Sequence, residues 1–462
     1  MQSLADTPSF YPRDRLALVH GQQRWTFGDL DARSETWART LVARGVCGGD
    51  LVAFSLPNGP EFIALAFGVY RTGATPAPIS GKLPAFERDA ILSVMQPRVY
   101  IDASDRPDAQ APGFDARPIA ASWKACTSGG STGRPKVIVD GRPASFAEGT
   151  EFIGIPANAT VLVPGPLYHN APFSAAVFAL WRGDTVVTMD CFDAEAALRL
   201  IEREAISWSI MVPTMLHRIW ALPAVVRGTI DLSSWKTVVH TAAAMPAWLK
   251  KAWIGWRGVD HIWEVYGATE GLVRCWIGGR EWLRRPGSVG RPSGGARLRI
   301  LDDRGDDAPV GAIGEVFAMP AGGAHSSYRY IGAERRETTG GWESVGDCGR
   351  VDADGYLYLA DRKNDLIISG GVNIWPAEVE AALLRHPAVL SCAVFGEPDD
   401  DLGQRVHALV ETRDPITLDE MRDFLRAYLA REKLPRMLSC RTEPVRDDAG
   451  KFRKSAFQKV EA

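Results

Sequence analysis

Apolar residues recur at helical spacing near the start of the chain, and each such run leads into a short apolar stretch. In residues 30–45, Leu30, Trp37 and Leu41 fall on one face of a helix, and Thr26 stands where a helix cap is expected. The following residues, DLVAFSL at 50–56, are typical of a short buried strand. The pattern therefore predicts a helix followed by a strand as the local unit.

The same unit returns further along the chain. Residues 58–79 place apolar side chains at helical spacing before an exit rich in glycine and proline, and residues 194–216 and 237–253 again alternate apolar strands with amphipathic helices. This alternation is typical of parallel sheets with helices on their faces. It predicts an α/β fold built on parallel-rich sheets.

The pattern changes twice in the second half. From about residue 287, short β-rich runs alternate with Gly, Asp and Pro turns, which predicts a small β-barrel-like subdomain over residues 287–360. After Asp361, two glycines precede a helix that begins after Pro376, and a second helix is expected at 418–433. We therefore expect an N-terminal domain of residues 1–361 and a smaller α+β domain of residues 362–462.

Composition narrows the classes of function. The chain has 462 residues, of which 46% are hydrophobic, and 53 Lys+Arg against 56 Asp+Glu give a formal charge of -3. These values argue against a disordered chain and against a strongly basic nucleic-acid binder. The N-terminus lacks a basic region leading into an apolar run, and no stretch approaches the roughly 18 apolar residues of a membrane helix. We expect a cytoplasmic protein without a membrane span.

The cysteines and histidines do not form a metal-binding pattern. The seven cysteines are scattered, and none of the eight histidines stands three or four residues from another His or Cys. We expect reduced core thiols and no dedicated cage of nitrogen and sulfur ligands. A metal ion is expected to arrive with a phosphate ligand instead.

The stretch SGGSTGRPK, from Ser128 to Lys136, has the composition of a phosphate-binding loop. Its glycines let backbone N–H groups turn toward an anion, its hydroxyl groups add donors, and its two cations add charge. It is not a Walker loop, because Arg-Pro-Lys follows the last glycine. By itself the stretch is equally consistent with a flexible surface loop.

Six further stretches accompany this loop in a fixed order. They are PLYHN at 166–170, TAAAMP at 241–246, YGATE at 266–270, RPGSVGRP at 285–292, the long segment at 345–380 and DDAGKFRK at 447–454. Over nearly its whole length the chain thereby resembles the adenylate-forming superfamily of acyl-CoA synthetases and adenylation domains. The resemblance implies that the C-terminal domain is mobile.

The resemblance also implies a nucleotide site. It assigns Thr269 to the phosphates, Glu270 to the Mg²⁺ ion that comes with ATP, Tyr266 to stacking on adenine, and Asp347 with Arg362 to the ribose hydroxyls. Carboxylate oxygens suit Mg²⁺, and an aspartate can accept from two hydroxyls. The full nucleotide-binding set that it implies is Ser128, Gly129, Gly130, Ser131, Thr132, Gly133, Lys136, Ala242, Ala243, Tyr266, Gly267, Thr269, Asp347 and Arg362.

Lys451 is the lysine expected to act in catalysis, together with Thr269 and Glu270. In the superfamily, a lysine after a glycine near the C-terminus contacts the carboxylate and the α-phosphate, and a point charge on a flexible stem suits that reach. Asn364 stands at the position of the hinge, where Asp or Lys is common. Gly370 and Gly371 stand where the pantetheine arm of coenzyme A passes. A solvated terminal lysine and a simple turn are the competing interpretations.

The acyl pocket is expected beside the PLYHN stretch. The resemblance places the following residues around the acyl group: His169, Asn170, Phe173, Thr241 and Trp263. A histidine beside a tyrosine is also common as an ordinary packing residue, so the sequence leaves the role of His169 open.

The motifs together favour an ATP-dependent acid–CoA ligase. A carboxylic acid and ATP·Mg²⁺ would give an acyl-adenylate and pyrophosphate, and coenzyme A would then displace AMP. One alternative is an adenylation enzyme that loads an acyl carrier protein, and another is an inactive nucleotide-binding regulator. The sequence leaves open which acid is used and whether the chain forms a homodimer.

Overall fold

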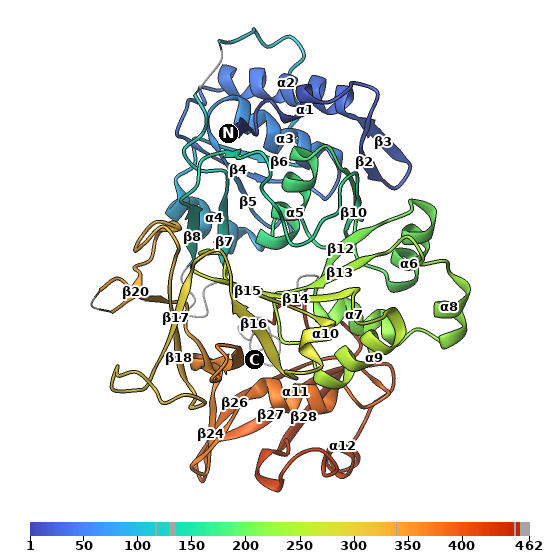
Figure 1. The fold of residues 1–462 in the computed structure, drawn as a ribbon, viewed down its shortest axis with the longest axis vertical. Coiled ribbons are helices and arrows are strands. Elements are labelled where there is room, and N and C mark those ends of the chain that lie inside the picture. Colours follow the sequence, from blue (N-terminus) through green and yellow to red (C-terminus); the bar gives the residue numbers. More distant parts are fainter. Residues whose placement is uncertain (116–117, 129–134, 339, 448–449, 453–462) are drawn as a thin grey trace.

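The computed structural model describes residues 1–115, 118–128, 135–338, 340–447 and 450–452. It confirms the predicted α/β architecture, with a large N-terminal part and a smaller C-terminal part below it in Figure 1. Among the described residues, no helix is both long and apolar enough to cross a bilayer. Seven cysteines are free, but only four of them are buried. The expectation that all seven lie in the core was wrong for Cys47, Cys191 and Cys440.

A parallel sheet forms the centre of the N-terminal part. Its strands run in the order β2-β11-β10-β12-β13-β14, and every neighbouring pair is parallel. The carboxyl ends of β13 and β14 therefore lie side by side, which brings Thr241 close to Tyr266. These strands are β2 (Leu16–His20), β10 (Thr160–Val163), β11 (Thr185–Thr188), β12 (Trp208–Met211), β13 (Thr237–His240) and β14 (Ile262–Gly267).

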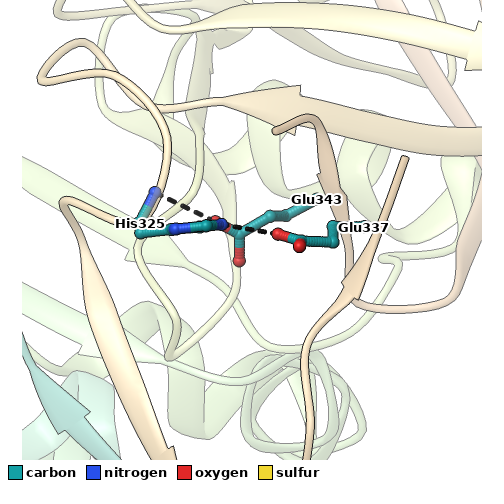
Figure 2. Close-up of side chains that lie close together, drawn as sticks. All are labelled: His325, Glu337 and Glu343. Carbon is teal, nitrogen blue, oxygen red and sulfur yellow. Dashed lines mark hydrogen bonds and ion pairs between the residues drawn. The ribbon is translucent and has the colours of Figure 1, made fainter. Parts of the chain in front are cut away.

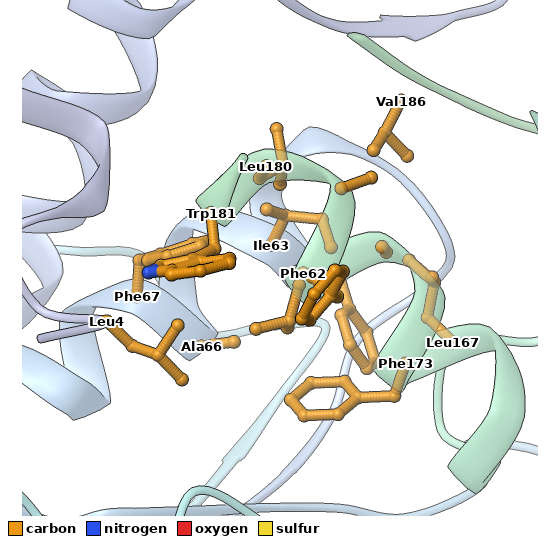
Figure 3. Close-up of a cluster of buried hydrophobic side chains, with 14 of the residues drawn as sticks. Leu4, Phe62, Ile63, Ala66, Phe67, Leu167, Phe173, Leu180, Trp181 and Val186 are labelled. Atoms are coloured by element: carbon orange, nitrogen blue, oxygen red, sulfur yellow. The ribbon is translucent and has the colours of Figure 1, made fainter. Parts of the chain in front are cut away.

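Helices follow these strands as the sequence pattern predicts. They are α5 (Asn170–Trp181), α6 (Ala194–Arg203), α7 (Pro213–Trp220), α8 (Ala224–Thr229) and α9 (Ala247–Arg257). Helix α5 is apolar on nearly all sides and is buried between the central sheet and the N-terminal helices. Figure 3 shows Phe62 of α3 (Pro60–Arg71) and Phe173 of α5 within this core, with Leu180 and Trp181 also on α5.

Three strands between residues 51 and 102 form a smaller parallel sheet with helices packed against it. Thr26 caps α2 in a reciprocal capping box with Asp29, which confirms the predicted helix start. The elements are β1 (Gln2–Ser3), α1 (Thr7–Phe10), β3 (Gln23–Thr26), α2 (Phe27–Ala43), β4 (Leu51–Ser55), α3 (Pro60–Arg71), β5 (Thr75–Pro78), α4 (Ala85–Met95) and β6 (Val99–Asp102). Strands β5, β4 and β6 form the small sheet, and β1 pairs with β9 (Ser145–Phe146).

The β-rich segment predicted over 287–360 continues the central sheet. Strand β16 pairs with β15 on one side and with β23 on the other, so the described strands extend the same sheet as an antiparallel part. They do not close into a separate barrel. The elements are β15 (Arg274–Gly278), α10 (Gly279–Trp282), β16 (Ser288–Pro292), β17 (Arg297–Leu301), β18 (Gly314–Met319), β20 (Arg336–Glu337), β21 (Glu343–Ser344), β22 (Asp347–Val351) and β23 (Leu357–Arg362).

A separate three-stranded antiparallel sheet carries the phosphate-loop stretch. It consists of β7 (Ala125–Ser128), β8 (Lys136–Asp140) and β19 (Tyr328–Ile331), with β8 in the middle. Strand β19 comes from the β-rich segment almost two hundred residues later. The sheet therefore joins the loop to a distant part of the chain.

The C-terminal part has its own five-stranded sheet and its own apolar core. Its elements are η1 (Lys363–Asp365), β24 (Ile367–Ser369), β25 (Val372–Ile374), α11 (Pro376–Leu383), β26 (Val389–Asp399), β27 (Gly403–Thr412), α12 (Leu418–Leu425), η2 (Arg431–Lys433) and β28 (Met437–Arg441). Helix α11 was predicted to start after Pro376 and begins at Pro376 itself. Helix α12 ends at Leu425, so the expected helix over 418–433 was too long, and a turn and a short 3₁₀ segment replace its second half.

Candidate active site

The phosphate-loop stretch lies between two paired strands. Ser128 ends β7 and is paired with Lys136 at the start of β8, so the stretch closes a hairpin. Five of the predicted nucleotide-binding residues lie outside the described residues: Gly129, Gly130, Ser131, Thr132 and Gly133. Lys136, the last residue of the stretch, is well described.

Lys136, Glu270 and Tyr330 form one hydrogen-bonded cluster. The Lys136 ammonium donates to Glu270 Oε1 at 3.2 Å and to the Tyr330 hydroxyl at 3.0 Å, and Tyr330 donates to the same Oε1 at 2.6 Å. Burial, with the Glu270 charge, raises the pKa of Tyr330, so this hydroxyl remains a donor. The Lys136 ammonium also lies 4.3 Å from the centre of the Tyr330 ring.

The position of Glu270 fits the predicted metal ligand. The residue is only 5% exposed, and among the described residues its second oxygen, Oε2, accepts no hydrogen bond. A carboxylate with one oxygen held and the other open suits Mg²⁺, which takes few protein ligands and keeps its phosphate and water oxygens. Thr269 precedes it in the same turn after β14 and is partly buried.

Sequence reasoning missed Tyr330. It lies 60 residues from Glu270 and 194 from Lys136 in the chain. Strand β19 reads YRYI, and its exposed Arg329 points away from the face that carries the two tyrosines. The alternation indicates a strand, but nothing in the sequence identifies β8 as its partner.

Tyr266, Asp347 and Arg362 meet at the junction of the two parts of the central sheet. The Tyr266 hydroxyl donates to Asp347 Oδ2 at 2.7 Å, and Arg362 Nε lies 3.5 Å from Asp347 Oδ1. Asp347 and Arg362 are directly paired across β22 and β23. Burial, followed by the Asp347 charge, raises the pKa of Tyr266 well above its usual value. The three predicted nucleotide residues are therefore together, with the carboxylate already held by donors.

The TAAAMP stretch leaves the sheet as an exposed loop next to Tyr266. Thr241 Oγ1 donates to the carbonyl of Val265 at 2.8 Å, which ties the loop to β14. Ala242 and Ala243 are exposed, and Ala242 has a left-handed backbone with φ of 75°. A residue with a Cβ pays for this conformation, and such strain is common beside ligand sites. Gly267, at the end of β14, is also exposed.

Three predicted acyl-site residues begin α5. His169 caps the helix, with its ring 4.4 Å from that of Tyr168, and Asn170 is the first helical residue. Phe173 is fully buried against Trp123 and Phe62, so it forms a wall of the core.

Trp263 lies elsewhere in the structure. Its indole packs on Trp276 at 5.3 Å and donates to the Asp260 carbonyl, beside a hollow about 460 Å³ in volume. Trp263 also packs against the edge of the large apolar cluster that contains Phe173, and its acyl role remains a prediction.

The tail that carries Lys451 is anchored to the C-terminal part and touches the N-terminal part at the start of α7. Arg446 holds the tail through the carbonyls of Cys392 and Gly450 and through Glu380. A Cβ on Gly450 would lie 3.4 Å from Thr214 Oγ1, at the start of α7. Lys451 follows directly and is exposed, with its backbone bonded to Asp447.

The same docking brings Lys451 near the phosphate-loop hairpin. Burial raises the pKa of the Cys126 thiol, and the charges of Lys124 and Lys451 oppose that rise. Cys126 belongs to β7, so the Lys451 ammonium acts on the strand that leads into the loop.

Other contacts fix the C-terminal part against the N-terminal part. His217 Nε2 donates to the Leu384 carbonyl at 3.2 Å, and Trp248 Nε1 donates to the Ala381 carbonyl at 3.3 Å. Asp361 Oδ2 accepts from the Ala377 N–H at 3.0 Å. The tail and α11 therefore contact helices α7 and α9 of the N-terminal part.

The predicted hinge and coenzyme A residues lie at two turns. Asn364 is in the short 3₁₀ segment between β23 and β24, where the chain leaves one sheet for another. Gly370 and Gly371 form the turn between β24 and β25, and both have positive φ, 56° and 79°. That turn favours glycine at both positions. Strand β24 lies at the lower edge of the molecule in Figure 1, away from β7 and β8.

One histidine–carboxylate cluster stands apart from these residues. Figure 2 shows the His325 ring directed toward Glu337 and Glu343, the grouping within the described residues whose ligand atoms could meet at one ion. His325 Nε2 lies 2.5 Å from Glu337, and Arg335 pairs with Glu343 at 3.0 Å. Arg335 therefore already offsets the charge of Glu343, although Glu343 Oε2 is buried and accepts no hydrogen bond among the described residues.

Comparison with known proteins agrees with this geometry. The model of the AMP-binding enzyme family matches residues 4–122 and 125–323, and the model of the AMP-binding enzyme C-terminal domain matches residues 378–446. The chain belongs to the AMP-binding enzyme family. The two models cover the segments that hold Lys136, Glu270 and Arg446.

Relatives within the AMP-binding enzyme family span most of the chain. The indoleacetate–CoA ligase of Aromatoleum aromaticum is 30% identical and covers 97% of this chain and 95% of its own length. The feruloyl-CoA synthase of an Amycolatopsis species is 32% identical over 91% of this chain and 90% of its own. The o-succinylbenzoate CoA synthetase of Bacillus subtilis, solved with its acyl-adenylate intermediate, has a TM-score of 0.81 and 25% identity over 99% and 98% of the two chains.

Proposed function

We propose that this protein activates a carboxylic acid with ATP and Mg²⁺ to an acyl-adenylate and transfers the acyl group to coenzyme A, releasing AMP and pyrophosphate. The observation that carries the proposal is the convergence of Lys136, Glu270 and Tyr330 with the docked tail that bears Lys451. The indoleacetate–CoA ligase and the feruloyl-CoA synthase, which match this chain along most of its length, are named for coenzyme A thioester formation, in agreement with this chemistry.

The first step requires two anions to approach each other. The acid carboxylate must reach the α-phosphate of ATP, so cations and N–H donors have to surround the phosphates before reaction. We assign Lys136 and Lys451 to supply this charge, and the stretch Ser128 to Lys136 to supply donors, as the sequence predicts. Mg²⁺, when bound, neutralises phosphate charge, and Glu270 is the carboxylate that we assign to hold it.

The nucleoside is assigned to the junction between β14 and β22. Tyr266 offers a ring beside the exposed loop of Ala242 and Ala243, and adenine would fit between them. Asp347 and Arg362 lie within reach of each other, so a ribose diol would replace the Tyr266 hydroxyl as the donor to Asp347.

We further assign residues 1–361 and 362–462 as two domains that rearrange between the steps. Asn364 lies where the chain crosses between sheets, so rotation there would carry the Gly370–Gly371 turn and the Lys451 tail together. A hinge has only to absorb a change in φ and ψ. We expect the enzyme to act in the cytoplasm, and a homodimer is the oligomeric form to test by light scattering.

The proposal is tested by separating the two half-reactions. A panel of acids that differ in length and ring content is scored for pyrophosphate release with ATP·Mg²⁺, and then for AMP release and thioester formation with coenzyme A. The expected result is acid-dependent pyrophosphate release followed by a coenzyme A thioester. Adenylate formation with transfer only to an acyl carrier protein would favour the carrier-loading alternative. No pyrophosphate with any acid would refute the proposal.

A further inference from the structure

Lys124 is a buried cation that the proposed reaction does not use. It precedes β7 and is only 4% exposed, and burial lowers the pKa of its ammonium, an effect that the Asp140 charge opposes. The ammonium lies 4.2 Å from the centre of the Trp123 ring. An ammonium buried in this way costs free energy unless its hydrogen bonds are fully made.

The hydrogen bonds of Lys124 point to the first turn of α5. Nζ donates to Asn170 Oδ1 in a short bond and to Ser174 Oγ at 3.0 Å. The third neighbour, Asp140, is more distant at 3.8 Å and already has a two-pronged pair with Arg142. Lys124 is therefore not needed to neutralise the charge of Asp140.

These contacts fix the orientation of the Asn170 amide. A lysine ammonium has donors only, so the amide must turn its oxygen toward Lys124 and its NH₂ group to the opposite side. Ser174 Oγ lies 3.4 Å from the same oxygen as a second donor. Among the described residues, the Asn170 NH₂ group makes no hydrogen bond to the protein, although Asn170 is partly buried beside His169 at the start of the helix.

We propose that Lys124 is a positioning residue that holds Asn170 as a hydrogen-bond donor to the acyl substrate, and that the natural acid therefore carries an oxygen acceptor on its acyl part. The acceptor is a carbonyl, hydroxyl or carboxylate oxygen. The inference rests on the proposed function and on the assignment of Asn170 to the acyl site. An acid with a purely hydrocarbon acyl part would leave the Asn170 NH₂ group without a partner, so such an acid should be a poorer substrate.

The test compares pairs of acids that differ by one oxygen acceptor, such as a straight-chain acid and its keto and hydroxy derivatives. The ratio of kcat/KM within each pair is measured by pyrophosphate release. The wild-type protein is expected to prefer at least one acceptor-bearing acid by about tenfold, the discrimination typical of one hydrogen bond. Asn170→Leu and Lys124→Met should each reduce that ratio to near unity, and the double variant should reduce it no further.

Asn170→Asp separates positioning from simple packing. Aspartate keeps the size of asparagine and pairs more strongly with Lys124, but it has no N–H to offer. We expect thermal stability to be kept and the preference for the acceptor-bearing acid to be lost. If the Lys124–Asn170 contact only supported the fold, this variant would keep the preference, and the proposal would be overturned.

Phe62→Leu is the matched control, because it loosens the core under α5 without touching the amide network. It should lower activity on both acids of a pair alike and leave their ratio unchanged. A ratio that stays at the wild-type value in Asn170→Leu and Asn170→Asp also overturns the proposal, even if Lys124→Met fails to fold. Absence of pyrophosphate with every acid would instead refute the proposed function, so the two failures are distinguishable.

Discussion

Replacing Tyr330 by phenylalanine removes one hydroxyl from the cluster that holds Glu270. The hydroxyl donates to Glu270 Oε1 at 2.6 Å, and Lys136 remains 3.2 Å from the same oxygen after the change. A hydrogen bond to a charged group contributes about 1.5–3 kcal/mol. Because Lys136 still holds the carboxylate, we take the lower value, which corresponds to about a tenfold loss in apparent affinity for the metal ion.

The assay reads metal binding directly. Mn²⁺ bound in the presence of a non-hydrolysable ATP analogue is counted by electron paramagnetic resonance, and the Mg²⁺ dependence of pyrophosphate release is measured beside it. Tyr330→Phe should raise both half-saturation values about tenfold, with little effect on nucleotide binding without metal. Tyr358→Phe is the control, since it removes a tyrosine–carboxylate bond of the same kind, to Asp352, outside the cluster. Metal half-saturation equal to wild type in Tyr330→Phe would refute the positioning of Glu270 by this hydroxyl.

Three further changes test the rest of the structure. Lys451→Ala should reduce adenylate formation at least about a hundredfold, the loss expected when a charge at the reacting phosphate is removed, while a supplied acyl-adenylate still reacts with coenzyme A. The two half-reactions are measured by pyrophosphate and thioester assays, and an equal loss in both would contradict the role of Lys451. Burial raises the pKa of Asp361 to about 6, so the folded protein favours the protonated carboxyl group. The stabilising contribution of this group is complete below about pH 4 and is lost as the pH rises through 6. Asp361→Asn should therefore show a smaller fall in melting temperature between about pH 4 and 7 than wild type, and an identical pH dependence of the melting temperature would disprove the assignment. Lys250→Met leaves Glu264 buried without its lysine and should lower the free energy of unfolding, measured by urea titration, by about 3–5 kcal/mol. Adding Glu264→Gln should restore part of this stability. No restoration would mean that the loss comes from packing and not from charge.

Local signals predicted much of the fold. Thr26 with Asp29 marks a helix start through groups three residues apart, and Pro376 marks another through its own ring. The end of α12 was misjudged because the periodic apolar pattern runs past Leu425, while the structure turns the chain there. Propensity and periodicity describe short stretches of chain. They do not describe the tertiary packing that decides where an element ends.

The residues of the candidate site also differ in whether a local sequence signal could identify them. Lys136, Glu270 and Lys451 stand inside recognisable stretches, so the resemblance could point to them. Tyr330 and Lys124 could not be found in this way, since each acts through a partner brought close by sheet pairing or helix packing. A buried lysine is rare enough to be informative, but its burial is visible only in three dimensions.

The Arg446 guanidinium donates a hydrogen bond to the carbonyl of Gly450, the residue before Lys451. That guanidinium ties the backbone beside Lys451 to Cys392 and Glu380 in the body of the C-terminal part. If the C-terminal part turns between the two half-reactions as we propose, Lys451 would travel with it. The turn that admits the thiol would then also withdraw this positive charge from the nucleotide site.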